Sequence, residues 1–228
     1  MIGIIGAMDI EVEGLKNMVQ NKSTRLISGI EFISGTLEGK DVVIAKCGIG
    51  KVFAALCAQT MILEYNIDYL INTGVAGTLT TKLSVGDIAI STDVVQHDMD
   101  TSPIGDPVGL ISGINVINFP ADSYLVSLAE EIIGNENIKN VKGIIATGDS
   151  FIAKAEQKEK ILSNFCAVAC EMEGGAIGHV AYVNNVKFLV LRAISDSADG
   201  SAHMDYPTFL KMAAENSVKI TQKLVARI

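Results

Sequence analysis

Short, unbroken apolar runs are the feature that most limits what this chain can fold into. They are rich in Val, Ile and Leu without polar alternation, and most end in glycine or a small polar residue. Strands of this kind are covered on both faces, as in the parallel sheets of α/β proteins. The runs lie at Ile2–Ile5, Val42–Ala45, Tyr69–Asn72, Ile88–Ile90, Ile144–Ala146, Ala167–Ala169 and Phe188–Leu191.

Segments with apolar residues at helical spacing lie between these runs. A last helix is expected from near Tyr206 towards Ile228, because Pro207 suits an early helical position. The alternation predicts an α/β fold with a largely parallel, twisted central sheet flanked by helices. At 228 residues, we expect a single domain over residues 1–228. The other predicted helices are Val52–Leu63, Ser123–Ile133 and Ala176–Val183.

Charge and targeting signals limit the partners. The formal net charge is −8 and no basic run occurs, which argues against nucleic acids and acidic membrane surfaces. No apolar run reaches the ~18 residues that a membrane-spanning helix needs, and no basic leader precedes the first strand. We therefore expect a cytoplasmic protein.

The cysteines and histidines do not form a metal-binding pattern. Cys47, Cys57, Cys166 and Cys170 contain no C-x-x-C pair, and are expected to be buried free thiols of a reducing compartment. The histidines lack the spacing of metal ligands. They are His97, His179 and His203.

Functional side chains are expected where the predicted strands end. Ligands of open parallel sheets bind beyond the carboxyl ends of the strands. Taken together, five strand ends here present small residues with carboxylates and one arginine, and this convergence is the main functional signal. The segments are 6–11, 47–51, 73–78, 170–175 and 192–199.

Two of these segments contain charges beside core strands. Glu171 and Glu173 end one apolar run, and Arg192 ends another. A buried arginine must be paired, and the glutamates are natural partners with a structural or a catalytic role. Alternatively, the glutamates are solvated or cap a helix. Glu11 begins a predicted helix, where an acidic side chain is also favourable for structure alone.

The glycine-containing segments do not match a nucleotide-binding loop. Gly48 and Gly50 precede Lys51, but the remaining P-loop positions are occupied by the wrong residues. The segment is either a tight turn or a substrate-lining loop. Near Val75, Ala76 and Gly77, small side chains let a ligand approach the backbone, although a plain turn is the alternative.

Taken together, several short motifs resemble the bacterial methylthioadenosine/S-adenosylhomocysteine nucleosidases, in family order and over nearly the whole chain. The resemblance implies a nucleoside phosphorylase-like α/β fold, a homodimer and hydrolysis of an adenosine-type N-glycosidic bond in methionine salvage and the methyl cycle. The motifs are Gly3–Met8 with Glu11, Gly48–Lys51, Ile71–Gly74, Gly86–Ile88, Gly148–Ile152, Glu171–Glu173 and Arg192–Asp196.

The resemblance implies a role for each catalytic residue. Asp196, held by Ser195, would protonate the purine so that adenine leaves neutral. Glu11 would activate the attacking water, and Arg192 would help to orient it. Glu173 would bind the ribose hydroxyls and stabilise the cationic sugar. Neither a metal nor an organic cofactor is implied.

The resemblance also implies which residues contact the substrate. Phe151 and Ile152 would surround the adenine, with Val75, Ala76 and Gly77 beside it. The loop 99–113 would reach the neighbouring subunit's active site. Its Ile104, Asp106 and Ser112 depart from the family pattern, which leaves the preferred 5′ substituent open. Val75 stands where serine is common, so one polar contact near Asp196 is absent. Residues implied on the sugar and 5′ side are Met8, Ile49, Met172 and Tyr206.

Three alternatives stay open. A purine nucleoside phosphorylase on the same fold would need a phosphate site built from arginines, but the chain has only Arg25, Arg192 and Arg227. A futalosine-type nucleosidase would differ only in its substrate. A catalytically silent nucleoside-binding sensor would not need the acidic residues that the chain retains.

Overall fold

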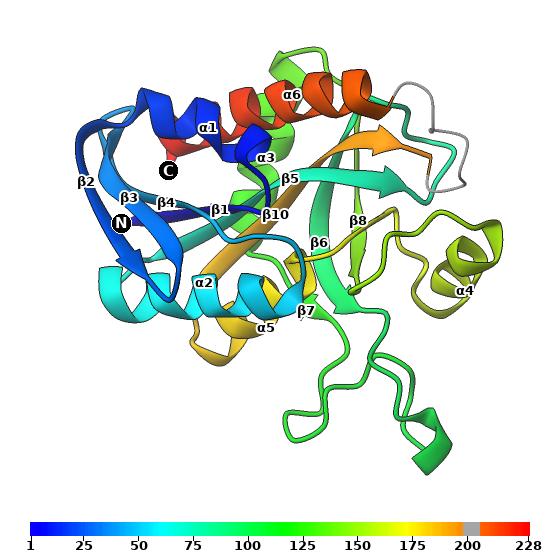
Figure 1. Ribbon diagram of the computed structural model, residues 1–228. Helices are drawn as coiled ribbons and strands as arrows, with labels where there is room; N and C mark the ends of the chain where they lie inside the picture. Colours follow the sequence, from blue (N-terminus) through cyan, green and yellow to red (C-terminus); the bar gives the residue numbers. More distant parts are fainter. Residues whose placement is uncertain (198–205) are drawn as a thin grey trace.

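Helices cover both faces of a large β-sheet (Figure 1). The computed structural model describes the backbone of residues 1–197 and 206–228, and the side chains of residues 1–197 and 209–228. The helices on one face are α1 (Asp9–Met18), α3 (Ser123–Asn135) and α6 (Tyr206–Arg227), and those on the other are α2 (Lys51–Tyr65) and α5 (Gly174–Val183). A further helix, α4 (Ala155–Phe165), lies beside the end of the sheet that contains β8.

The sheet is partly closed on itself. Its order is β2-β3-β4-β1-β5-β10-β6-β8-β9, and β9 also pairs with β5. The last five strands in this order therefore form a closed circuit of hydrogen-bonded pairs. The strands are β1 (Ile2–Gly6), β2 (Gln20–Ile27), β3 (Ile30–Leu37), β4 (Lys40–Lys46), β5 (Tyr69–Thr78), β6 (Ile88–Gln96), β7 (Phe119–Pro120), β8 (Asn140–Thr147), β9 (Ala169–Glu171) and β10 (Lys187–Asp196).

The sheet is mixed rather than purely parallel. Five of the strand pairings between described residues are parallel and five are antiparallel. Part of the antiparallel share comes from the β2–β3–β4 meander, whose two-residue turns are Ser28-Gly29 and Glu38-Gly39. All four turn residues have positive φ, as type I′ hairpins require. The α/β class itself is confirmed.

Most predicted elements are present. The predicted helices correspond to α1, α2, α3, α5 and α6, and β1, β4, β5, β6, β8 and β10 contain the predicted runs. The run Ala167–Ala169 is displaced, since β9 begins only at Ala169. Strands β2 and β3 and helix α4 were not predicted. β2 is exposed along almost its whole length, so no apolar run marks it.

Strands β5 and β10 are longer than their apolar runs predict. They pair in parallel from Tyr69 and Lys187 up to Gly77 and Asp196, well beyond the apolar core of each run. The register shifts between Ile194 and Asp196, which marks a β-bulge near the end of β10. Residues expected in loops after these strands therefore lie within rigid paired strands.

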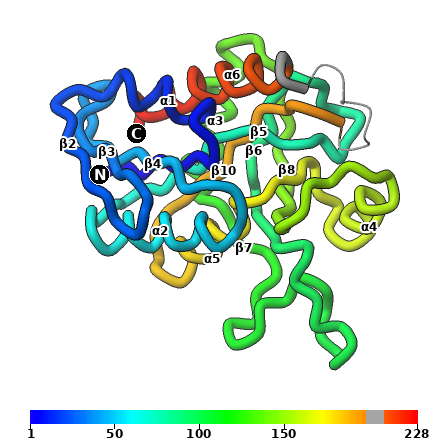
Figure 2. Tube along the Cα trace, viewed as in Figure 1, coloured from blue at the N-terminus to red at the C-terminus, as the bar shows by residue number. Residues whose placement is uncertain are grey.

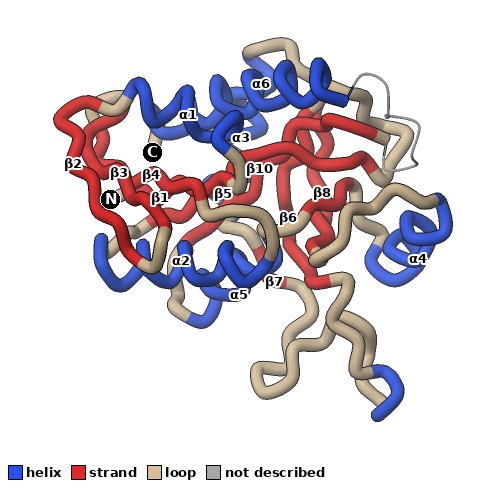
Figure 3. Tube along the Cα trace, viewed as in Figure 1, coloured by secondary structure: helices blue, strands red, loops and turns tan. Residues whose placement is uncertain are grey.

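The segment between β6 and β7 projects away from the body of the molecule (Figures 1 and 2). Its regular structure is limited to one turn of 3-10 helix, Ser102–Ile104, and a bridge between Ile111 and Val116 (Figure 3). This agrees with the expectation that residues 99–113 form a loop. The side chain of Ile104 is 82% exposed, so an apolar group lies at the tip of a projecting loop.

Candidate active site

One pocket lies at the carboxyl ends of the strands, as the strand-end argument predicted. Strands β1, β5 and β10 contribute residues at or just beyond their ends, and so do the segments that follow β4, β8 and β9. Its lining is Ala7, Met8, Glu11, Ile49, Val75, Ala76, Ser150, Phe151, Ile152, Cys170, Glu171, Met172, Glu173, Ser195 and Asp196.

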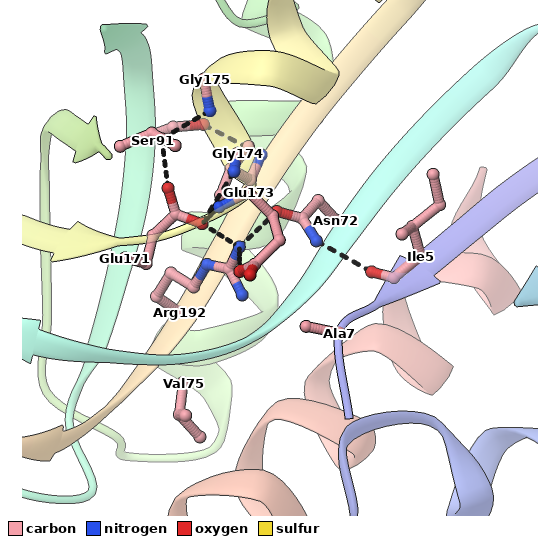
Figure 4. A network of polar contacts seen from close by, with 12 residues as sticks. Ile5, Ala7, Asn72, Val75, Ser91, Glu171, Glu173, Gly174, Gly175 and Arg192 are labelled. Atoms are coloured by element: carbon pink, nitrogen blue, oxygen red, sulfur yellow. Dashed lines mark hydrogen bonds and ion pairs between the residues drawn. The ribbon is translucent and has the colours of Figure 1, made fainter. Parts of the chain in front are cut away.

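Arg192 lies at the centre of a buried polar network behind this pocket (Figure 4). Its Nη2 donates to Glu171 and to Oδ1 of Asn72, at 2.5 Å in the second case, and lies 3.6 Å from Oε2 of Glu173. Nδ2 of Asn72 donates in turn to the carbonyl of Ile5, at 2.9 Å. The predicted pairing of the arginine with the glutamates is therefore confirmed.

Both carboxylate oxygens of Glu171 accept hydrogen bonds from the surrounding protein. Its Oε2 accepts hydrogen bonds from the amides of Glu173 and Gly174, at 2.9 and 2.7 Å, and its Oε1 accepts one from Thr147. A carboxylate at a helix N-terminus is favourable, so Glu171 both neutralises Arg192 and stabilises the start of α5. The two alternatives considered for the glutamates, pairing and capping, thus occur together in this one residue.

Glu11 is held by backbone amides. In the first turn of α1, its Oε2 accepts from the amides of Ala7 and Met8, at 2.7 and 2.9 Å, and its Oε1 accepts from Val75 of β5, at 3.0 Å. Burial raises the pKa of Glu11 above the ordinary value, while Arg192 and the three amides oppose this shift. The carboxyl group is therefore fixed in position and desolvated, as a general base requires.

Gly74 lets Glu11 and Arg192 approach the same piece of backbone. A Cβ at this position would overlap Nη1 of Arg192 and lie 2.6 Å from Oε1 of Glu11. Nε and Nη1 of Arg192 are buried without a hydrogen-bond partner in the described part of the chain. Unused donors beside a buried carboxylate form a site with the polarity needed to hold a water molecule.

Glu173 carries a strongly perturbed carboxyl group. It is 4% exposed and precedes α5, and its Oε1 accepts from the amide of Gly50, at 2.9 Å. Burial and the nearby Glu171 raise the pKa of Glu173 to about 7, against the opposing influence of Arg192 and Gly50. A carboxyl group that titrates near neutral pH inside a pocket is typical of a functional site.

The bulge in β10 places two consecutive side chains on one side. In a regular strand Ser195 and Asp196 would point to opposite faces. Both instead line the pocket, and Oγ of Ser195 donates to Oδ2 of Asp196, at 2.9 Å. The bulge redirects a side chain next to a site, as bulges often do.

The rest of the pocket wall is mostly apolar. Ile49 and Phe151 are 57% and 58% exposed, so they form an open rim rather than a closed core. Exposed apolar side chains beside buried acids suit a ligand that combines a planar ring with a polar sugar. The other apolar residues here are Met8, Val75, Ala76, Ile152 and Met172.

Two residues predicted at the site do not line it. Gly77 pairs with Cys170 of β9, and Arg192 lies behind the wall. The side chain of Tyr206 lies outside the described residues, as does His203. Ala7, Ser150 and Cys170 also line the pocket, although the sequence pattern gave none of them an individual role. Ala7 and Ser150 directly adjoin predicted residues, which is the signal that could have identified them.

The remaining expectations concern metals, thiols and membranes. Within the described residues, no group of three or more His, Cys, Asp and Glu side chains could hold a metal ion. Three cysteines are buried, but Cys166 is exposed, because it ends α4 in a left-handed conformation at the surface. The prediction for this thiol was wrong. None of the described helices is both long and apolar enough to cross a membrane.

A family profile described as the phosphorylase superfamily matches residues 1–226. The chain belongs to this superfamily. Among solved structures it is similar to a Helicobacter pylori 5′-methylthioadenosine/S-adenosylhomocysteine nucleosidase, with 35% identity, a TM-score of 0.94, and 100% of this chain and 98% of that chain covered. It is also similar to the nucleosidase from Neisseria meningitidis in complex with methylthio-immucillin-A. The identity is 35% and the TM-score is 0.95, with 100% of this chain and 99% of that chain covered.

A solved structure named as a futalosine hydrolase is as similar to this chain as the two nucleosidases are. The futalosine hydrolase of Helicobacter pylori strain 26695 shows 34% identity and a TM-score of 0.95, with 100% of this chain and 97% of that chain covered. The resemblance to the nucleosidases and the phosphorylase-like fold are thus confirmed. The comparisons support a nucleosidase, a hydrolase of N-glycosidic bonds.

Proposed function

We propose that this protein hydrolyses the N-glycosidic bond of 5′-methylthioadenosine and S-adenosylhomocysteine, releasing adenine and the 5-thioribose product. The observation that carries the proposal is the meeting of Glu11, Glu173 and Asp196 in one pocket, with Arg192 directly behind it. This reaction would serve methionine salvage and the methyl cycle.

Protonation of the leaving group is assigned to Asp196. Cleavage of the ribosyl C–N bond builds negative charge on the purine, so an acid near its N7 lets adenine leave neutral. Asp196 is 6% exposed and Ser195 donates to one of its oxygens, which supports a fixed orientation toward the base. Ile152 and Phe151 then supply the apolar surfaces that a purine ring needs.

Activation of water is assigned to Glu11 with help from Arg192. The free donors of Arg192 near Gly74 can hold a water molecule, and the adjacent Glu11 carboxylate can take its proton. Glu173 would accept hydrogen bonds from the ribose hydroxyls, and its charge would stabilise the cationic sugar. An acid on the purine side and a base on the water side follow the logic of inverting glycoside hydrolysis.

The arginines argue against a phosphorylase. Arg25 pairs with Glu64, at 2.9 Å, and Arg227 pairs with Glu131, at 2.8 Å, both on the surface. Arg192 is already enclosed by carboxylates. No arginine among the described residues therefore lines the pocket with an unpaired charge that could bind a phosphate.

An assay in phosphate-free buffer tests the function directly. We expect the purified protein to release free adenine from 5′-methylthioadenosine and S-adenosylhomocysteine, measured by chromatography of the products. Adenosine and a futalosine-type nucleoside are run in parallel. Cleavage of the futalosine-type substrate alone would reassign the substrate, a strict need for phosphate would indicate a phosphorylase, and tight binding without any turnover would indicate a sensor.

We also propose a homodimer in which the loop 99–113 lies near the partner's active site. An exposed apolar stripe on α2 supports this, since such surfaces mark protein interfaces. Val52, Phe53, Leu56 and Leu63 in α2 are 72%, 50%, 46% and 71% exposed.

Light scattering coupled to size exclusion should therefore give twice the mass of one chain. Val52→Asp is expected to shift the protein towards the monomer, because it places a charge in the apolar stripe that the dimer would bury. Leu26→Asp, on the exposed β2 strand, is the matched control and should leave the mass unchanged. A wild-type monomer at micromolar concentration would contradict the dimer.

A further inference from the structure

Three segments that follow different strands are joined to one another beside the pocket by hydrogen bonds and an ion pair. Nζ of Lys51, the first residue of α2, donates to Oδ1 of Asp98, at 2.6 Å, and the amide of Lys51 donates to Oδ1 of Asp149, at 2.8 Å. The amide of Asp149 donates to Oδ2 of Asp98, at 2.9 Å. The segments after β4, β6 and β8 are thereby joined through one lysine and two aspartates.

The residue before Lys51 reaches the pocket. Gly50 has φ +99°, a conformation that favours glycine, and its amide donates to Oε1 of Glu173, at 2.9 Å. A Cβ on Gly50 would lie 3.0 Å from Oδ1 of Asp149. The backbone of Gly50 is therefore held on one side by Lys51, which is bonded to Asp98 and Asp149, and on the other side by the carboxylate of Glu173.

We propose that Lys51, Asp98 and Asp149 form a clamp that positions Glu173 through the backbone amide of Gly50. The proposal rests on the function proposed above, because Glu173 matters only if it binds the sugar. None of the three clamp residues lines the pocket, so they are positioning residues that act through another group.

The burial of the clamp supports a role beyond surface charge. The side chains of Lys51 and Asp98 are 19% and 30% exposed, whereas Lys142 and Glu130, which form a surface ion pair at 2.7 Å, are 41% and 45% exposed. Water and salt screen a partly buried pair less than an exposed one. The hydrogen bond from Lys51 also keeps Asp98 ionised, since it helps to lower the pKa of Asp98 against the effect of burial.

The amide of Gly50 has a particular electrostatic role at Glu173. Two other carboxylates face this residue, Glu171 from β9 and Glu11 from α1, and the Cys47 thiol is also near; the nearby positive charge is Arg192 of β10. The amide of Gly50 donates a further hydrogen bond to the Glu173 carboxylate, from the segment that follows β4. Its loss would raise the pKa of Glu173, so that less of the carboxylate is ionised at a given acidic pH.

The test is the pH profile of kcat/KM for Asp98→Asn and Lys51→Met. If ionised Glu173 is needed, activity falls as the pH drops below its pKa. In both variants we expect this acid limb to move up by about one pH unit, which is about a tenfold loss on the acid side of the limb. The loss of kcat/KM relative to wild type should be smallest near pH 8.5, where Glu173 is ionised in every variant.

Two variants serve as controls. Lys51→Arg keeps the charge and a donor, so it should restore the wild-type limb. Glu130→Gln breaks the exposed pair with Lys142 and should leave the profile unchanged. A loss of kcat/KM by the same factor at every pH, or no loss in Asp98→Asn, would overturn the clamp.

A measurement without substrate separates the clamp from the function. In ¹H–¹⁵N NMR of the unliganded protein, the Gly50 amide proton should shift with pH as Glu173 ionises, and Glu173→Gln should abolish that titration. We expect Asp98→Asn to weaken it strongly. If the wild type cleaves no nucleoside but the amide titration behaves in this way, the proposed function fails while the clamp stands. An amide that does not report Glu173 overturns the clamp whatever the activity.

Discussion

Asp196→Asn is expected to lower the rate of adenine release by about 10²- to 10⁴-fold, the usual value of a positioned general acid. Asparagine has nearly the shape of a protonated aspartic acid and can still accept the hydrogen bond that Ser195 donates at 2.9 Å. It can donate a hydrogen bond to the purine, but it has no acidic proton to transfer. The loss should therefore fall on kcat, with KM changed far less.

The measurement is a steady-state assay with 5′-methylthioadenosine, together with thermal unfolding of both proteins. Asp122→Asn is the matched control, because Asp122 caps α3 away from the pocket and asparagine caps helices about as well. It should keep wild-type kcat and stability. An Asp196→Asn enzyme within tenfold of wild type would remove Asp196 from the role of acid.

The apolar runs predicted the central strands because burial on both faces leaves a clear pattern in one segment. Strands β2 and β3 lack it, since their positions depend on hairpin turns and on pairing with β4 rather than on burial. Helix α4 begins without a capping side chain and buries only Ile161 and Phe165, so few apolar residues mark it in the sequence. The antiparallel pairings between distant strands, such as β5 with β9, depend on tertiary contacts that no local pattern encodes.

The candidate site was largely predictable because its charges stand next to apolar runs. Glu11, Glu173 and Arg192 each follow or end such a run, and a charge there must be paired or functional. The bulge that turns Ser195 and Asp196 to one side was not predictable, since it arises from the register of two long strands. The clamp was also missed, because Asp98 and Asp149 meet Lys51 only in the folded chain.

Removal of the central arginine should have the largest effect on stability. Arg192→Met leaves Glu171 and Glu173 buried without their counter-ion, and breaking a buried pair in this way costs about 3–5 kcal/mol of unfolding free energy. Methionine has a similar length, so lost packing contributes little. Urea unfolding followed by circular dichroism measures the loss, and adenine release should fall as well because the water site loses its donors.

The dependence on pH identifies the cause. Without Arg192 the pKa of Glu173, already about 7, rises further in the folded state, so the folded variant binds more protons than the unfolded chain. Both proteins lose stability as the pH rises above the unfolded pKa of Glu173, because the folded state keeps its proton. The deficit of the variant relative to wild type should therefore grow only above about pH 7, where Glu173 ionises in the folded wild type but stays protonated in the folded variant. Arg227→Met removes only an exposed pair and should behave like wild type. Glu171→Gln added to Arg192→Met should recover part of the loss, because it removes one of the two unpaired charges. A deficit that is the same at every pH would attribute the loss to packing instead of charge.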